Sequence, residues 1–191
     1  LDKVTIDKDY SVTIKPDKTS ITLNLMFDQM FKVSSGGSLT ISGNNGASLT
    51  ISGKSEANTV DTGGFVLVDG GSLTILDGVT ISSAKAKKGG AIYLKSGSCT
   101  LSGSSKITGS TASENGGAVY VADGTFTVKD YALVDASNDV YLEDDEVITV
   151  ASGYSGTIKN IALSDYEEGR NVVDVSDYHS IDSNKFVLND E

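Results

Sequence analysis

Three tyrosines in similar short strand-like runs are the residues of this chain best suited to contact a ligand. Tyr93, Tyr120 and Tyr141 each stand in a short run in which aliphatic residues precede and follow the tyrosine. Side chains alternate between the two faces of a β-strand, so the three rings should point away from the aliphatic residues beside them. Stacked one repeat apart, they would form an outward strip that either holds sugar rings or packs on itself for stability. They are the candidate ligand-binding residues.

The strands that carry these tyrosines belong to a repeat. The sequence GGAIYL at residues 89–94 returns as GGAVYV at 116–121 and, more loosely, as GGFVLV at 63–68. A second strand-like run begins eight residues after the second glycine of each pair. A further apolar residue stands seventeen residues after the same glycine. Three short strands per repeat at a spacing of 26 and 27 residues indicate a solenoid.

The repeat, together with the many Thr, Val and Ile residues, predicts an all-β fold, a parallel β-helix or β-solenoid with three short strands per coil. A coil here means one turn of the solenoid. We expect about six or seven coils with atypical ends, in a single β-helix domain over 1–191. Residues 1–30 form the N-terminal capping coil, 31–165 the regular coils and 166–191 the C-terminal cap.

Two segments depart from the regular repeat. The sequence SLTISG at residues 38–43 returns at 48–53, and the extra length of this coil should bulge out at 43–46 and 54–59. Near the end, Ser164 and Glu167 have the spacing of a capping box, and Gly169 comes two residues later. This pattern predicts one helical turn over 164–169.

Cys99 stands at the position that Leu73 and Phe126 occupy in the neighbouring repeats. We therefore interpret it as a small buried hydrophobic residue rather than a reactive thiol. As the single cysteine, it excludes an internal disulfide and leaves the redox compartment open.

A column of threonines also repeats: Thr40, Thr74, Thr100, Thr127 and Thr149. Regular threonine arrays occur in ice-binding solenoids. Two residues further along these strands, where a second column would stand, the chain has Leu76, Lys129 and Ala151. A regular threonine array is therefore not formed, and the preference of threonine for strands is the favoured explanation.

The charge balance narrows the classes of partner. The formal net charge is −11, with a pI near 4.4 and one arginine. Nucleic-acid binding needs clustered Lys and Arg, so no nucleic-acid partner is expected.

No apolar run approaches the roughly 20 residues of a membrane span, so no membrane insertion is expected. Residues 1–3 lead directly into a strand pattern, which is not that of a signal peptide. Because a strongly acidic surface keeps copies of a protein apart, we expect a monomer.

The repeats resemble a known class of proteins. GGAIY or GGAVY, followed by GTFTV at 124–128, is similar to the coils of right-handed parallel β-helix proteins on bacterial surfaces, including the repeats of chlamydial polymorphic outer-membrane proteins. Residues 138–142, 148–150 and 163–166 resemble the segment that comes after such coils in large adhesin-like proteins of host-associated bacteria. The resemblance covers about residues 30–170. It implies right-handed winding, an extracellular or cell-surface location, and adhesion.

Many β-helix proteins are polysaccharide lyases or hydrolases, so catalysis is an alternative. Arg170 and His179, the only residues of their types, lie off the regular strands. Four acids are candidates for a carboxylate pair: Asp69, Glu143, Asp174 and Asp177. Nothing in their spacing brings two of them face to face across a groove, as hydrolysis requires. The acidic run 143–146 is typical of a charged turn, because consecutive acids point in different directions. We expect no enzyme activity, no cofactor and no metal.

These observations favour a non-enzymatic surface or secreted β-helix module that is adhesin-like or a structural stalk. One alternative is a carbohydrate-binding module that uses the tyrosine strip, and another is a degenerate polysaccharide lyase or hydrolase. The expected partners are host or cell-wall glycans or surface proteins.

Overall fold

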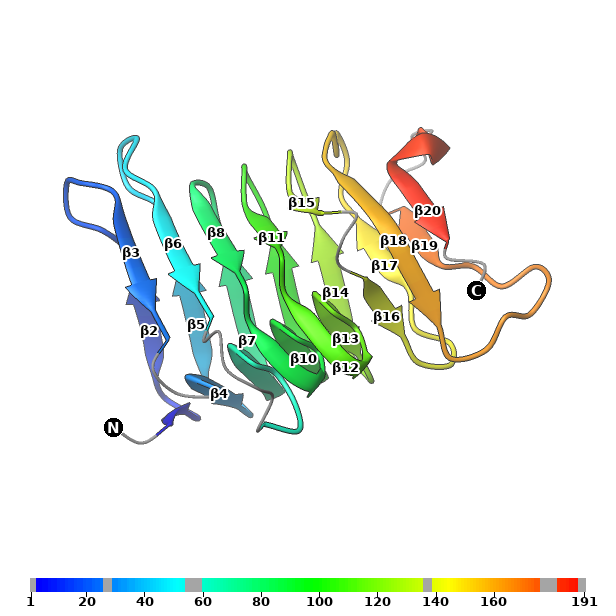
Figure 1. Cartoon of the computed structure of the whole chain (residues 1–191), viewed down its shortest axis with the longest axis horizontal. Coiled ribbons are helices and arrows are strands. Elements are labelled where there is room, and N and C mark those ends of the chain that lie inside the picture. The colour runs from blue at the N-terminus through cyan, green and yellow to red at the C-terminus, as the bar shows by residue number, and fades with distance from the viewer. Residues whose placement is uncertain (1–2, 26–28, 54–59, 136–138, 176–181, 189–191) are drawn as a thin grey trace.

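The computed structural model of the chain describes residues 3–25, 29–53, 60–135, 139–175 and 182–188. The described strands wind into a parallel β-solenoid, and the coils lie side by side along the long axis from the N-terminal to the C-terminal end (Figure 1). Corresponding strands of successive coils pair into three parallel sheets, called here the first, second and third sheets in the order of their strands within a coil.

The first sheet contains the three strands that follow the paired glycines and their counterparts in the other coils. Its members in order are β1 (Val4–Ile6), β4 (Phe31–Ser34), the start of β7 (Val66–Ile75), the start of β10 (Ile92–Leu101), β13 (Val119–Val121), β16 (Val140–Leu142) and the end of β18 (Thr157–Leu163). Six successive parallel pairings join these strands, which corresponds to about six turns.

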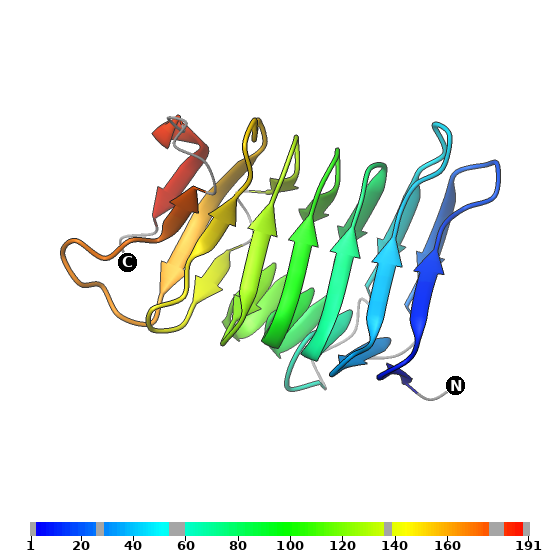
Figure 2. The ribbon, with the colours of Figure 1, turned by 180° about the vertical axis from the view of Figure 1, so that it is seen from behind.

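The second and third sheets complete each coil (Figures 1 and 2). The second contains β2 (Ser11–Ile14), β5 (Ser38–Ile41), the ends of β7 and β10, β14 (Thr125–Val128), β17 (Ile148–Val150) and β19 (Val173–Val175). The third contains β3 (Ile21–Asn24), β6 (Leu49–Ser52), β8 (Val79–Ser82), β11 (Lys106–Thr108), β15 (Leu133–Val134), the start of β18 and β20 (Phe186–Leu188). The prediction of an all-β parallel solenoid is confirmed, and its right-handed sense stays a prediction.

Two short elements differ from the expected pattern. A fourth, two-stranded ladder joins β9 (Lys85–Lys88) to β12 (Thr111–Asn115) in the middle coils. The only helix among the described residues is the 3-10 helix η1 (Ser183–Lys185).

The predicted helical turn at 164–169 is wrong, since the chain there forms bends and a turn. One capping pattern does not offset the cost of nucleating an isolated helical turn.

The interior is a stack of apolar side chains from successive coils. In one column of the second sheet Leu73, Cys99 and Phe126 are neighbours in register, and each is fully buried. Cys99 is therefore the small buried hydrophobic residue that its repeat position predicts. Burial raises the pKa of its thiol to about 12, which keeps the sulfur protonated and unreactive near neutral pH.

The paired glycines are required by the backbone. Gly63, Gly89 and Gly116 have φ of +60°, +62° and +73°, a region that other residues rarely adopt. The second glycines of the first two pairs are needed for space, because a Cβ on Gly64 would lie 2.3 Å from the carbonyl oxygen of Gly90, and a Cβ on Gly90 would lie 2.3 Å from that of Gly117. At Gly117 the nearest atom would be Oδ1 of Asp139, at 2.7 Å. Each coil can therefore approach the next closely where the first strand begins.

The extra length of the second coil lies in its corners. The two copies of SLTISG are β5 and β6, which belong to the second and third sheets of one coil. Between them, the backbone N–H of Asn44 donates to the carbonyl of Ala47 and the N–H of Ala47 to the carbonyl of Asn44, so the predicted bulge at 43–46 is a closed loop. The second predicted bulge, at 54–59, lies outside the described residues.

Candidate functional site

The three predicted tyrosines form one column on the outer face of the first sheet. Tyr93 on β10, Tyr120 on β13 and Tyr141 on β16 are partners in the parallel register. The ring centroids of Tyr93 and Tyr120 lie 4.9 Å apart with an angle of 21° between the ring planes, and those of Tyr120 and Tyr141 lie 4.8 Å apart with 29°. The rings are stacked face to face, one per coil, so the predicted ladder is confirmed as a geometric unit.

The exposure of the three rings differs. Tyr120 is 1% exposed because a ring covers each of its faces, whereas Tyr93 and Tyr141 are half-buried. In the same column, Leu67 precedes Tyr93 and Ala162 follows Tyr141. A ligand can therefore reach a ring face only at an end of the ladder, and the central ring contributes to the packing between coils.

Polar groups fix the central ring. The Tyr120 hydroxyl donates a hydrogen bond to the carboxylate of Glu143, which follows β16 on the next coil. The ammonium of Lys88 on β9 lies 3.5 Å from this hydroxyl and 5.1 Å from the ring centroid, a cation–π distance. Burial raises the pKa of Tyr120, and the hydrogen bond to Glu143 and the charge of that carboxylate raise it further. Burial also raises the pKa of Tyr93, again with a contribution from the charge of Glu143.

An acidic cavity lies between the turn after β16 and the loop after β18. Arg170 donates from Nη2 to the carbonyl of Glu143 at 3.3 Å and from Nη1 to the carbonyl of Asp165 at 2.8 Å. Beside it lies a cavity of about 440 Å³. Its wall consists of Asp144, Asp145, Val147, Asp165, Glu167, Glu168, Gly169, Arg170 and Asn171. Five carboxylates against one guanidinium give this region a negative potential.

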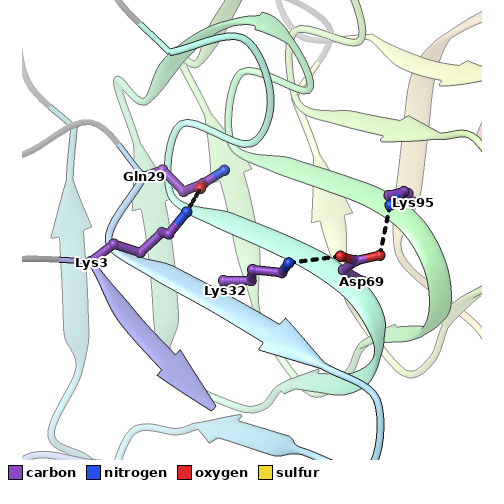
Figure 3. A network of polar contacts seen from close by, with 5 residues as sticks. All are labelled: Lys3, Gln29, Lys32, Asp69 and Lys95. Carbon is purple, nitrogen blue, oxygen red and sulfur yellow. Dashed lines mark hydrogen bonds and ion pairs between the residues drawn. The ribbon is translucent and has the colours of Figure 1, made fainter. Parts of the chain in front are cut away.

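The N-terminal part of the same face carries a basic network (Figure 3). The carboxylate of Asp69 lies 2.8 Å from the ammonium of Lys32 and 3.0 Å from that of Lys95, so one acid bridges the coils before and after its own. Hydrogen bonds from Lys32 and then Lys95 lower the pKa of Asp69 below its ordinary value. Nearby, Lys3 donates to the Oε1 atom of Gln29 at 3.0 Å. The outer face thus changes from basic to acidic along the solenoid axis.

Acidic side chains in the corners also join successive coils. The carboxylate of Asp139 accepts the backbone N–H groups of Gly116 and Gly117. At the corner between the second and third sheets, Asp77 accepts the backbone N–H of Ser104 at 2.9 Å and its hydroxyl at 2.6 Å. Sequence reasoning did not find these contacts. The pair Asp77-Gly78 is a turn signal that could have found this second corner in the sequence, whereas Asp139 is marked only by taking the place of the second glycine of the repeat.

Among the acids that the structure describes, Asp69 and Glu143 are not brought together as a catalytic pair would be. Asp69 and Glu143 belong to coils three steps apart, about 14 Å at roughly 4.8 Å per coil, whereas paired catalytic acids stand roughly 5–10 Å apart. Asp174 lies on β19 in the second sheet, away from both. Asp177 and His179 lie outside the described residues. Within the described ranges, no group of three His, Cys, Asp or Glu side chains is placed to hold a metal ion.

The predicted threonine column is in register along the second sheet as far as β17. It continues one coil further than predicted, because Thr13 pairs with Thr40. The remaining members are Thr74, Thr100, Thr127 and Thr149. At the C-terminal end Asp174 takes the next position, so the column ends where the coils become irregular.

Among the described residues, no helix has the length and apolar character needed to cross a membrane. Comparison of the chain with protein-family models, with curated proteins and with solved structures gives no match.

Proposed function

We propose that this chain is a non-enzymatic β-solenoid module of a bacterial surface or secreted protein and acts as a stalk or an adhesive unit. The observation that carries the proposal is the use of the outward polar and aromatic groups for contacts between coils. Asp69 bridges two lysines from neighbouring coils, Glu143 binds the hydroxyl of Tyr120, and Asp139 caps the paired glycines of the coil before it. The extracellular location rests on the resemblance of the GGAIY repeats to bacterial surface proteins.

The test measures adhesion and turnover together. If the chain is an adhesive unit, beads coated with the protein should adhere to surfaces that carry mucin, bacterial cell-wall glycan or matrix proteins. If it is a stalk, the beads should bind none of these surfaces, and the protein should behave in scattering as a rigid rod. At roughly 4.8 Å per coil, six turns make a body about 30 Å long. Release of reducing ends or unsaturated products from a panel of polysaccharides would contradict the proposal.

A second candidate function is carbohydrate binding at the tyrosine ladder. The specific observation that favours it is the end of the ladder at Tyr141, where the next position in the column is Ala162 and the ring is only half-buried. Screening the native protein against a broad glycan array tests this function. Binding that persists when the tyrosines are replaced would assign it to another surface.

A further inference from the structure

We propose that Tyr141 is the floor of a site for one neutral pyranose ring, which occupies the position above Ala162 where a fourth ring of the ladder would lie. The inference rests on the second candidate function, carbohydrate binding at the ladder, and names the residue, the position and the class of sugar.

The spacing of the ladder defines the space. Each coil adds one ring, and neighbouring ring centroids lie 4.9 and 4.8 Å apart. Ala162 is the register partner of Tyr141 on the next coil, and it is the last described member of the column. A methyl group covers far less of a neighbouring ring than a phenol does. One coil step is also about the thickness needed for a ring to stack on Tyr141.

The rings of the ladder differ in exposure. Tyr120 and Tyr141 occupy the same position of successive coils, and each has a tyrosine on its N-terminal side. Tyr120 has a second ring on its other side and is 1% exposed, whereas Tyr141 has Ala162 there and is half-buried. The difference between the two is the missing ring.

The other end of the ladder is not equivalent. Tyr93 is followed toward the N-terminus by Leu67, whose branched side chain is large enough to cover a ring face. Beside it, Lys95 is committed to the carboxylate of Asp69. An added ring therefore fits at Tyr141 rather than at Tyr93.

The charges around Tyr141 select the class of sugar. Glu143 lies on the same strand end, and the adjoining cavity is lined by Asp144, Asp145, Asp165, Glu167 and Glu168. An anionic sugar such as a uronate would be repelled by this region. The hydroxyls of a neutral sugar can donate to carboxylates, while the C–H groups on one face of the pyranose lie against the electron-rich face of the tyrosine ring.

The experiment uses the whole chain and three soluble probes, followed by NMR chemical-shift titration and saturation-transfer difference. The probes are methyl β-D-glucopyranoside, methyl β-D-glucuronide and N-acetyl-L-tyrosinamide. The main variant, Ala162→Tyr, fills the proposed position with a fourth ring. The matched control, Leu67→Tyr, adds a ring at the opposite end of the same ladder and leaves Tyr141 unchanged.

The expected result is millimolar binding of the glucoside by the native protein and by Leu67→Tyr, with an affinity at least about tenfold lower in Ala162→Tyr. The glucuronide should bind more weakly than the glucoside to every form. The inference is overturned if no form binds the glucoside, if Ala162→Tyr binds it as well as the native protein does, or if only the tyrosine derivative binds.

These outcomes separate the inference from the functions on which it rests. Glucoside binding that Ala162→Tyr leaves unchanged would keep carbohydrate binding as a function and reject this position. Circular dichroism and thermal unfolding of both variants show that the added rings leave the fold intact. A loss of binding in Ala162→Tyr together with a melting temperature at or above that of the native protein is the result that supports the site.

Discussion

The hydroxyl of Tyr120 on β13 donates a hydrogen bond to the carboxylate of Glu143, which follows β16 on the next coil. The bond joins the centre of the aromatic ladder to the start of the acidic turn at 143–146. Arg170, which donates to the carbonyl of the same Glu143, extends the connection to the loop beyond β18. Through its carboxylate and its backbone carbonyl, Glu143 thus connects β13 of the preceding coil to the loop that follows β18.

Tyr120→Phe should destabilise the protein through the loss of this bond. A hydrogen bond to a charged group contributes about 1.5–3 kcal/mol, and the ring itself stays in the stack, so we expect a decrease of about 2 kcal/mol in the free energy of unfolding. Urea unfolding measures it. Tyr131→Phe is the matched control, because Tyr131 is 68% exposed and its change should be close to zero. Equal stability of the two variants would show that the bond to Glu143 contributes nothing.

The repeat made much of this arrangement predictable. The register of Tyr93 with Tyr120 followed from the 27-residue repeat, as did the burial of Cys99 between Leu73 and Phe126. Tyr141 comes only 21 residues after Tyr120, and its register followed from the match of residues 138–142 to the first strand of the repeat. These predictions depend on the repeated strand motif and on the alternation of side chains along a strand.

The rest depends on features that the period does not contain. Glu143 reaches Tyr120 across a coil because of the direction of its side chain at a corner, which repeat counting does not define. The ladder of β9 and β12 escaped prediction because its sequences, KAKK and TASEN, lack the alternation of a buried strand. The ladder is flanked by Leu67 at one end and by Ala162 at the other, and these neighbours become known only once the register is known.

Gly90→Ala should be among the most damaging single substitutions in the chain. The added Cβ would lie 2.3 Å from the carbonyl oxygen of Gly117 and 2.5 Å from that of Thr111, and backbone atoms on two sides leave no direction for relief. We expect a loss of about 3 kcal/mol or more in urea unfolding.

Gly153→Ala is the control for conformational strain alone. Gly153 has a positive φ, +76°, which Gly90 does not have, and nothing lies within 4 Å of its Cβ position. Only the cost of a left-handed backbone therefore applies at Gly153, about 1–2 kcal/mol. If Gly90→Ala cost no more than Gly153→Ala, the close approach of the coils at the paired glycines would be wrong.

Asp69→Asn should weaken the protein near neutral pH and have less effect in acid. Hydrogen bonds from Lys32 and Lys95 lower the pKa of Asp69 in the folded protein below its ordinary value of 3.8. A lowered pKa in the folded state means that the stabilisation is present above pH 3.8 and is lost as the pH falls through the folded value. The pairs are partly exposed, so we expect about 0.5–1 kcal/mol at neutral pH.

Urea midpoints measured near neutral pH and well below pH 3.8 test this, with Asp61→Asn as the matched control. Asp61 pairs with Lys87 at 2.6 Å, but its side chain is 79% exposed, so its removal should change the midpoint little. A difference between native protein and Asp69→Asn that stays constant in acid would reject the role of the ionised carboxylate.

Cys99 should not react with a maleimide until the protein unfolds. Its side chain is fully buried between Leu73 and Phe126, and burial keeps the thiol protonated. Labelling followed by mass spectrometry across a urea series should therefore track the unfolding transition. Rapid labelling in the absence of urea would contradict the burial. Cys99→Ser should lower the free energy of unfolding by about 1–3 kcal/mol if its hydroxyl finds no partner.

The same residue should make the native protein sensitive to alkali. The pKa of Cys99 rises from an ordinary value of 9.0 to about 12 in the folded state, so between these values the unfolded chain loses a proton that the folded chain retains. A raised pKa in the folded state means that the contribution to stability is complete below pH 9.0 and is lost as the pH rises toward about 12, by about 1.4 kcal/mol per pH unit. Cys99→Ala removes this proton and leaves every other titratable group in place. In urea unfolding between these pH values, the native protein should lose stability faster than Cys99→Ala, and parallel pH profiles would show that the thiol is not the group responsible.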